Sequence, residues 1–235
     1  MPKTIEKIAA WGVHIFTSLG LISGFLAMIA ITEKAWPLAF FWLFISFIID
    51  GVDGSLARYF KVKEVLPQMN GKNIDYVIDF ANYAIIPAFF FYYAEMVSQV
   101  WMYPCLAVIL LTSALYYGKE GMVADNEYFV GFPVLWNLVV FFEFFVFHNQ
   151  PLLNIIFVFI FGALHFVPIK FAYPSHSKRY FWLHMIASVL FFLAAAANLY
   201  YYPEKILALD LILVGVVVYF GLVAIMDTWF NKKAY

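Results

Sequence analysis

The sequence is short of charge and almost free of cysteine. Asp, Glu, Lys and Arg make up 12% of its 235 residues, whereas a soluble domain has about 25%. Hydrophobic residues reach 65%, so the chain is expected to be an integral membrane protein. Its one cysteine, Cys105, excludes an internal disulfide. A net charge of -1 creates no positive field for a polyanion, so nucleic acid is not expected as a partner.

Long apolar runs, separated by short polar or proline-containing connections, account for most of the chain. A membrane-spanning helix needs about 20 consecutive apolar residues. By that measure the spans cover residues 12–32, 36–57, 73–97, 101–118, 133–148, 151–170, 180–201 and 206–230. We therefore expect an all-α fold: a polytopic membrane helical bundle of about eight transmembrane helices, in a single domain over residues 1–235.

The basic residues are distributed unevenly between the connections. If both termini and the loops after spans two, four and six are assigned to one side, that side holds all but two of the 14 lysines and arginines. The other side keeps Lys34 and Lys205. By the positive-inside rule, both termini and the loop 58–72 are expected on the cytoplasmic side.

Four carboxylates flank that loop. Asp50 and Asp53 lie three residues apart at the end of the second span, and Asp75 and Asp79 lie four apart at the start of the third. Either spacing puts a pair on one face of a helix, so an antiparallel hairpin brings the two pairs together. Ionisable groups inside a membrane are costly and therefore point to function.

A divalent cation is the partner that this acidic cluster predicts. Purely structural acids would need basic partners, and the two helices offer none before Arg58 and Lys72. Carboxylate oxygens suit magnesium, manganese or calcium rather than zinc or copper. Two such ions can clamp the attacking and leaving oxygens of a displacement at phosphorus.

Small residues accompany the acids. Gly54 and Ala57 lie between Asp53 and Arg58, and Gly71 stands at the mouth of the third span. A backbone without bulky side chains lets a ligand approach closely, although glycines in membrane helices also serve helix packing. Arg58 is a candidate phosphate ligand; the alternative is an interfacial arginine whose charged end reaches water.

Together these residues resemble the signature of the CDP-alcohol phosphotransferases. In that family of membrane enzymes a hydroxyl acceptor displaces CMP from a CDP-linked lipid or alcohol. Every signature position is matched, in the order Asp50-x2-Asp53-Gly54-x2-Ala57-Arg58 and then Gly71-x3-Asp75-x3-Asp79. The resemblance implies a membrane transferase.

The resemblance also implies a role for each signature residue. In similar enzymes two divalent cations, Mn²⁺ or Mg²⁺, hold the diphosphate of CDP-diacylglycerol. Carried over, the metal ligands are Asp50, Asp53, Asp75 and Asp79, and the CDP-lipid site is formed by Gly54, Ala57, Arg58 and Gly71. Asp79 is implied to be the general base for the acceptor hydroxyl. Because a metal-bound carboxylate is a weak base, the alternative is that Asp79 mainly positions the hydroxyl.

A broader likeness covers most of the chain. The spans and the segment Asp125-Asn-Glu-Tyr-Phe-Val-Gly-Phe-Pro133, followed by Trp136-Asn137, resemble the bacterial phosphatidylcholine synthases. This likeness implies CDP-diacylglycerol and choline as substrates, with phosphatidylcholine and CMP as products. It also implies the bacterial cytoplasmic (inner) membrane, an active site facing the cytoplasm, and a homodimer.

The residues themselves suggest where choline would bind. A quaternary ammonium is best held by aromatic faces and a carboxylate, and the spans have no lysine or arginine to spare for an anionic acceptor. The candidates are Trp136 and Glu143, with Tyr83 near the acids and Asn82 and Asn137 as hydroxyl-orienting amides. The alternatives are core aromatic residues and a protonated, hydrogen-bonded core glutamate.

Two other functions fit the acidic cluster. Within the same class, the acceptor would be serine, glycerol phosphate or inositol phosphate. A different class is a divalent-cation transporter that uses the acids as a transport site. Transport sites are expected near the bilayer midplane on interrupted helices, often in repeated halves, and the sequence has one cluster at one face and no evident repeat.

Overall fold

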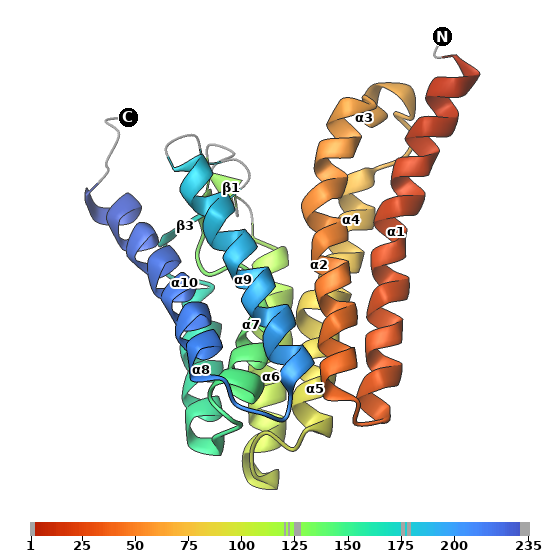
Figure 1. Cartoon of the computed structure of the whole chain (residues 1–235). Coiled ribbons are helices and arrows are strands. Elements are labelled where there is room, and N and C mark those ends of the chain that lie inside the picture. Colours follow the sequence, from red (N-terminus) through yellow and green to blue (C-terminus); the bar gives the residue numbers. More distant parts are fainter. Residues whose placement is uncertain are drawn as a thin grey trace. The chain divides into compact units, whose positions relative to one another are not determined.

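The computed structural model describes residues 3–119, 121, 123–124, 128–174, 177 and 180–230. The first three residues of the segment Asp125–Pro133 therefore lie outside the described part of the chain. The described residues are largely helical (Figure 1). They divide into two compact units, Met1–Glu95 and Met96–Tyr235, and each unit is described by itself.

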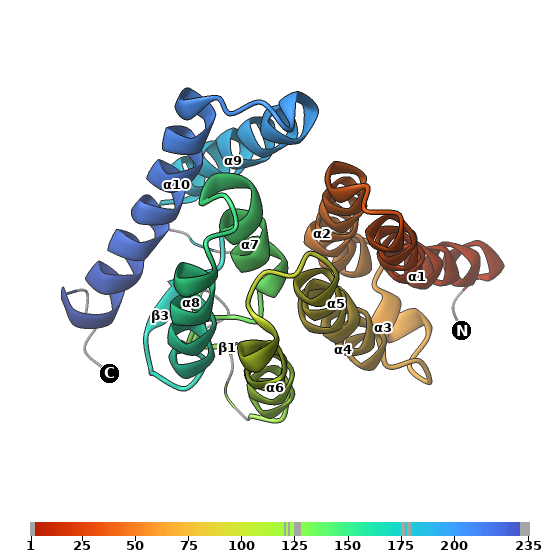
Figure 2. The same ribbon diagram turned by 90° about the horizontal axis from the view of Figure 1, so that it is seen from below.

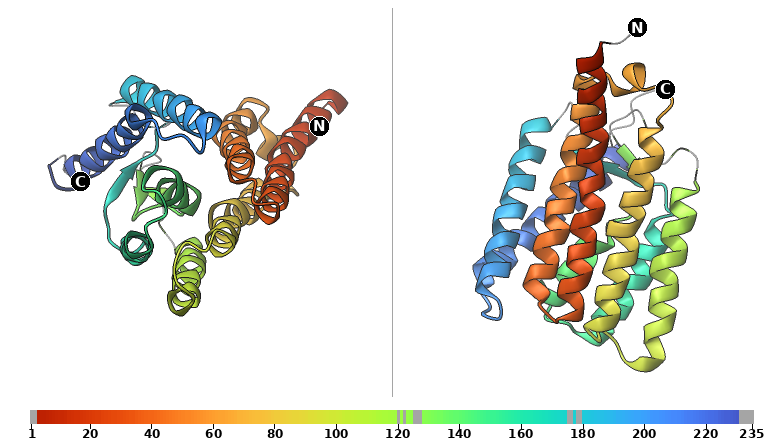
Figure 3. Two further views of the ribbon diagram at one scale, coloured as in Figure 1. Left: turned by 60° about the horizontal axis from the view of Figure 1, so that its bottom comes forward. Right: turned by 90° about the vertical axis from the view of Figure 1, so that its right-hand side faces the viewer.

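Unit 1 contains three long helical rods. Its elements are α1 (Thr4–Thr32), α2 (Trp36–Tyr59), the short α3 (Val62–Val65), α4 (Gly71–Phe80), the π-helix η1 (Ala81–Ile85) and α5 (Ile86–Tyr93). The last three elements follow one another without a break, so Gly71–Tyr93 is one rod of membrane-spanning length. Figure 3 shows this rod beside α1, with α1 and α2 paired along their lengths.

Local sequence features set where these helices begin and pack. Pro37 lies in the first turn of α2, where its missing N–H costs nothing. The Asn70 side chain accepts a hydrogen bond from the backbone of Asn73, which caps α4. Gly24 allows α1 to approach η1, because a Cβ at this position would clash with Asn82 Oδ1. The rod that carries Asp75 and Asp79 is thereby held against α1.

Unit 2 contains the remaining helices and a small sheet. Its elements are α6 (Gln99–Tyr117), β1 (Val123–Ala124), β2 (Tyr128–Val130), α7 (Trp136–Phe141), the π-helix η2 (Phe142–Val146), α8 (Pro151–Leu164), β3 (Lys170–Ala172), α9 (Phe181–Tyr201), α10 (Leu207–Ile225) and the π-helix η3 (Met226–Phe230). Figure 2 shows α9 and α10 as neighbours, and the two helices contact each other.

The three short strands form an antiparallel sheet in the order β1-β2-β3. Its register pairs Tyr128 with Ala172 and Val130 with Lys170. This sheet was not expected from the sequence, because strands of two or three residues carry no measurable alternation. The all-α class is nevertheless confirmed, since the sheet only connects helices.

Six helices among the described residues are long and apolar enough to cross a membrane. They correspond to six of the eight expected spans. The expected spans 133–148 and 151–170 appear as the shorter apolar helices Trp136–Val146 and Pro151–Leu164. Both fall below the roughly 20 residues that a straight crossing requires, and the second ends early because the chain turns into β3.

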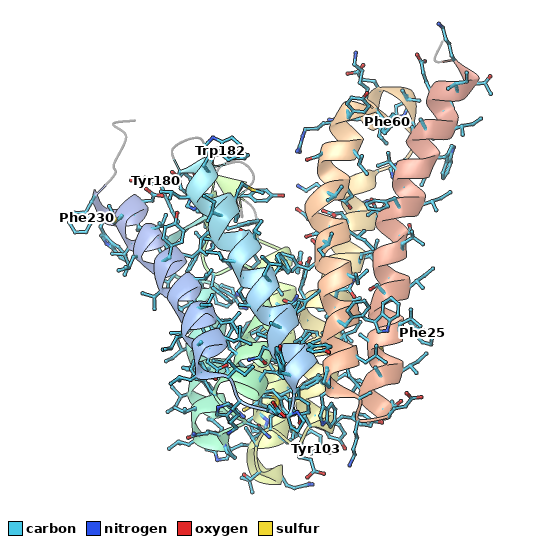
Figure 4. The ribbon with its side chains drawn as sticks, in the orientation of Figure 1. Phe25, Phe60, Tyr103, Tyr180, Trp182 and Phe230 are labelled. Atoms are coloured by element: carbon cyan, nitrogen blue, oxygen red, sulfur yellow. The ribbon has the colours of Figure 1, made fainter. Side chains whose placement is uncertain are left out.

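Large apolar side chains cover the outside of the helices. Figure 4 labels Phe25 on α1 and Trp182 on α9, and both point outward. Phe25 is 61% exposed and Trp182 is 75% exposed. Exposed apolar surface on this scale is unfavourable in water and is what a bilayer accepts.

Candidate active site

Three carboxylates from two helices converge in unit 1. Asp50 lies on α2, and Asp75 and Asp79 lie on α4. One carboxylate oxygen of each residue lies within 4.8 Å of the corresponding oxygens of the other two. The three side chains are half-buried. The antiparallel arrangement of α2 and α4 therefore brings together acids that are up to 29 positions apart in the sequence.

Asp53 is the fourth acid, and it lies beside this trio rather than within it. It is buried, with 7% of its surface exposed. The Thr17 hydroxyl of α1 lies within hydrogen-bonding reach of its carboxylate. Asp53 lines the same small cavity as the other three acids. The structure thus places all four predicted ligands around one space, with Asp53 held from a different helix.

The cavity between the acids is small. Its volume is about 10 Å³, and α1 and α2 complete its wall with Thr17, Gly20, Ser46 and Ile49. A space of this size holds about one water molecule, so it could hold an ion but not a nucleotide. A bound nucleotide would have to lie outside the cavity and present its phosphates to it.

The donor set around this cavity fits a hard divalent cation. Carboxylate and hydroxyl oxygens are the ligands that magnesium, manganese and calcium prefer. Lys72 is the basic residue closest in sequence to Asp75, and its ammonium lies over the Tyr76 ring, 5.1 Å from the ring centre. Among the described residues, no lysine or arginine forms an ion pair with any of the four acids. Carboxylates this close repel one another unless a cation or a proton lies between them.

The predicted CDP-lipid residues have different surroundings. A Cβ on Gly54 would meet only Arg58 Nη1, at 3.6 Å, so the backbone of Gly54 borders open space. Arg58 is exposed, and its Nη2 donates to Ser55 Oγ at 3.0 Å. Ala57 packs on a small apolar cluster that includes Val62. A ligand can therefore reach Gly54 and Arg58, whereas Ala57 also supports the position of α3.

Gly71 begins α4 against a histidine of α1. A Cβ at Gly71 would lie 3.2 Å from His14 Cε1, which is tighter than an ordinary contact. His14 is buried, and in the described part of the chain its Nε2 atom has no hydrogen-bond partner. Glycine at this position thus allows the N-terminus of α4 to approach α1 closely.

Two of the predicted acceptor residues lie in unit 1, on the π-helix η1. The Tyr83 hydroxyl donates a hydrogen bond of 2.8 Å to Asp50 Oδ2. The Asn82 amide donates a hydrogen bond of 3.1 Å to the backbone carbonyl of Gly20 on α1. Both side chains are buried. η1 therefore ties the acid-bearing rod to both neighbouring helices.

The other predicted acceptor residues lie in unit 2 and are fully buried. Trp136 donates its indole N–H to Ser113 Oγ at 2.8 Å, and its ring meets the His165 ring edge to face. Asn137 Oδ1 accepts from the backbone of Leu138. Among the residues that the structure describes, Asn137 Nδ2 and both carboxyl oxygens of Glu143 have no hydrogen-bond partner. Tyr83 thus contacts one of the acids, Asn82 contacts α1, and the other three predicted residues lie in the second unit.

Comparison with known proteins shows sequence similarity over most of the chain, beyond the signature at residues 50–79. A sequence model of the family described as CDP-alcohol phosphatidyltransferase matches residues 13–230. The chain belongs to this family. The expected membership is confirmed, and the protein is an integral membrane transferase.

Proteins named phosphatidylcholine synthase are among the relatives. The one from Rhizobium meliloti is 39% identical over 74% of this chain and 71% of its own. The one from Borreliella burgdorferi is 40% identical over 75% of each chain. The one from Pseudomonas aeruginosa is 32% identical over 86% of this chain and 84% of its own. The similarity therefore extends well beyond the signature at residues 50–79.

Sequence reasoning missed several contacts of the predicted residues. Neither the hydrogen bond from Tyr83 to Asp50 in unit 1 nor that from Trp136 to Ser113 in unit 2 could be read from spacing, because each joins separate helices. The π-helices η1 and η2 were also missed. Pro87, six residues before the end of the rod, was the available signal for η1, since it lacks the N–H that a regular helix needs.

Proposed function

We propose that this protein is a phosphatidylcholine synthase, which joins choline to CDP-diacylglycerol and releases phosphatidylcholine and CMP. The observation that carries the proposal is the convergence of Asp50, Asp75 and Asp79 inside a chain whose relatives, over most of its length, bear that name. We further propose that residues 1–235 act as one catalytic domain, because the family match at 13–230 spans both units.

The four acids would hold the metal. Asp50, Asp53, Asp75 and Asp79 would bind two divalent cations, Mn²⁺ or Mg²⁺, since they offer only oxygen donors around one cavity. When bound, such cations neutralise the charge of the diphosphate and of the departing phosphate. The polar cavity lies within a highly apolar protein, which keeps competing water away from the reacting groups.

The CDP-lipid would lie over the exposed side of α2. Gly54 borders open space, so the nucleotide can approach its backbone. Arg58 is exposed and can reach a phosphate oxygen. Ala57 and Gly71 keep the surrounding helices close without side chains that would fill the subsite. This surface would be on the cytoplasmic side of the inner membrane, where the positive-inside rule puts loop 58–72.

Asp79 is the proposed general base. It would take the proton of the choline hydroxyl as the choline oxygen forms a bond to the phosphorus that carries diacylglycerol. The bond from that phosphorus to the bridging oxygen of the diphosphate breaks, and CMP leaves with the electron pair. Asp79 lies deeper along its helix than Asp75, where the acceptor is shielded from water. If Asp79 only positions the hydroxyl, replacing Asp79 would leave more turnover than if Asp79 is the general base.

Choline itself would be held by an aromatic and acidic pocket. Glu143 has a buried carboxyl group with no partner among the described residues, and a buried carboxylate favours a cation. Trp136, seven positions before Glu143, offers an aromatic ring, and Asn137 offers an amide N–H that has no partner among the described residues. Asn82 and Tyr83, on η1 of unit 1, remain proposed acceptor-binding residues on the strength of the sequence prediction, with Asn82 as an amide that could orient the hydroxyl. A homodimer is part of the proposal by analogy with similar enzymes.

An acceptor-competition assay tests this function. Purified protein in lipid nanodiscs is given CDP-diacylglycerol, Mn²⁺ or Mg²⁺, and one labelled acceptor: choline, serine, glycerol phosphate or inositol phosphate. We expect metal-dependent phosphatidylcholine formation with choline alone. The matched control is Asp79→Asn, which should retain CDP-lipid binding. Turnover of another acceptor in preference to choline would refute the choline assignment. Cation flux into sealed liposomes that contain the protein, without any transfer to an acceptor, would support a transporter.

A further inference from the structure

Tyr83 makes a hydrogen bond that ordinary acceptor binding does not require. Its hydroxyl donates to Asp50 Oδ2 at 2.8 Å. Tyr83 is 4% exposed, so water does not compete for this bond. Asp50 is one of the three acids that converge on the candidate metal position. One of its two oxygens is therefore fixed by a neighbour on another helix.

The backbone explains why Tyr83 lies at this position. Within η1 the N–H of Ile86 donates to the carbonyl of Ala81, five residues earlier, instead of four. Pro87 follows and has no N–H to donate to the carbonyl of Tyr83, four residues before it. The wider turn is the local response, and π turns of this kind are frequent at functional sites.

Two further contacts fix the tyrosine ring and its turn. The Phe47 ring meets the Tyr83 ring edge to face, with 5.7 Å between the ring centres. Phe47 precedes Asp50 by three residues on α2, so one face of this helix holds both the ring and the hydroxyl of Tyr83. On the other side of η1, Asn82 donates to the Gly20 carbonyl on α1.

We propose that Tyr83 is a positioning residue for the metal site, which acts by orienting the Asp50 carboxylate. The hydrogen bond stops rotation of that carboxylate and leaves its second oxygen available to a cation. Removing partners of this kind typically weakens metal binding by about 10- to 100-fold. This inference rests on the proposed metal-dependent function, but it does not depend on which alcohol is the acceptor.

The test is Tyr83→Phe, which keeps the ring against Phe47 and removes only the hydroxyl. Mn²⁺ binding is measured by electron paramagnetic resonance of the free ion, and CDP binding in the presence of Mn²⁺ is measured by calorimetry, both without choline. We expect the Kd for Mn²⁺ to rise about 10-fold. Tyr92→Phe on α5 is the matched control, because Tyr92 is an exposed tyrosine of the same rod. The Kd of this variant for Mn²⁺ should equal the wild-type value.

A double-mutant cycle shows whether Tyr83 acts through Asp50. Asp50→Asn keeps one side-chain oxygen, so it should bind Mn²⁺ more weakly but measurably at raised Mn²⁺ concentration. In this background, adding Tyr83→Phe should change the Kd for Mn²⁺ by much less than the roughly 10-fold expected in the wild type. A second loss of the same size would overturn the proposal. An unchanged Mn²⁺ Kd in Tyr83→Phe, with a lower unfolding temperature of the metal-free protein, would show a structural hydrogen bond instead. An unchanged Mn²⁺ Kd with a raised KM for choline would show an acceptor contact, and this outcome would also overturn it.

The same experiment separates this inference from the proposed function. If the wild-type protein binds no Mn²⁺, the proposed metal-dependent function fails, and the role of Tyr83 fails with it. If the wild-type protein binds Mn²⁺ and Tyr83→Phe binds it equally well, only the role of Tyr83 is refuted. Should Tyr83→Phe not fold, Phe47→Leu loosens the tyrosine ring while its hydroxyl remains, and it is expected to weaken Mn²⁺ binding by less than 10-fold.

Discussion

In unit 1, two buried side chains of η1 donate to partners on other helices: Tyr83 to Asp50 and Asn82 to Gly20. In unit 2, Glu143 is buried just as deeply, yet within the described part of the chain neither of its carboxyl oxygens has a hydrogen-bond partner, and the Asn137 amide nitrogen has none. A paired polar group stabilises a fixed geometry. An unpaired buried carboxylate costs free energy, and a proton or a cationic partner would relieve that cost.

Under the proposed function, this difference corresponds to different tasks for the two units. Unit 1 has a preorganised set of oxygen donors, which suits an ion that must be held in one place. Unit 2 has a buried glutamate in an apolar environment, which would pair with the choline cation when choline binds. The following predictions, from the largest expected effect to the smallest, test this contrast.

The largest effect is expected at Asp79. Asp79→Asn should lower kcat by about 10²- to 10⁴-fold, because the amide cannot take a proton from the acceptor hydroxyl. Binding of the CDP-lipid should remain, since the asparagine keeps one side-chain oxygen at the metal position and the other three acids are intact. Single-turnover kinetics and a CDP-lipid binding assay check both statements, with Glu33→Gln, an exposed acid of the same unit, as the control. Wild-type kcat in Asp79→Asn would remove its catalytic role.

The next effect separates Asp50 from Asp53. Asp50→Ala removes a member of the converging trio, so it should abolish Mn²⁺-dependent CDP binding. Asp53→Ala removes a carboxylate outside the trio and should weaken this binding by about 10- to 100-fold. Calorimetric titration of CDP with and without Mn²⁺ measures both. Equal loss of Mn²⁺-dependent CDP binding in the two variants would show that Asp50 is no more important for metal binding than Asp53.

Glu143→Gln tests whether the buried carboxyl group of unit 2 contacts choline. If the carboxylate faces the choline ammonium, the amide should raise the KM for choline about 10-fold, because one close ionic contact is lost. CDP-lipid binding should stay unchanged. If Glu143 is protonated in the resting protein and never meets choline, the amide replaces a neutral acid and the KM stays constant. Initial rates at varied choline concentration distinguish the two, with Glu95→Gln as an exposed control.

The smallest effect concerns packing around η1. Gly24→Ala would place a methyl group against Asn82 Oδ1, so it should lower the free energy of unfolding by about 1–3 kcal/mol. Gly12→Ala on the same helix meets nothing within 4 Å and should be neutral or slightly stabilising. Unfolding in detergent by denaturant titration compares the pair. Equal stability would mean that α1 and η1 are not closely packed.

Much of this architecture was predictable because a membrane limits what a sequence can do. Apolar runs must form helices there, since no water is present to satisfy the backbone, and six of the eight expected spans are helices of full length. The helices at 136–146 and 151–164 are shorter than the predicted spans 133–148 and 151–170. Composition does not show where a chain leaves a helix to form a small sheet. The π-helices were missed for the same reason, since their hydrogen-bond pattern depends on neighbouring helices.

The sequence alone determined that Asp50 and Asp53 share a helix face, that Asp75 and Asp79 share another, and that a family signature joins them. Periodicity is a property of a single helix, so it needs no further information. Only the tertiary structure decided that Asp50, rather than Asp53, joins the α4 pair, that Tyr83 donates to Asp50, and that Glu143 has no partner among the described residues. These facts depend on the register between helices and on the local widening at η1 and η2, and contacts between segments, not the residues of one segment, set that register.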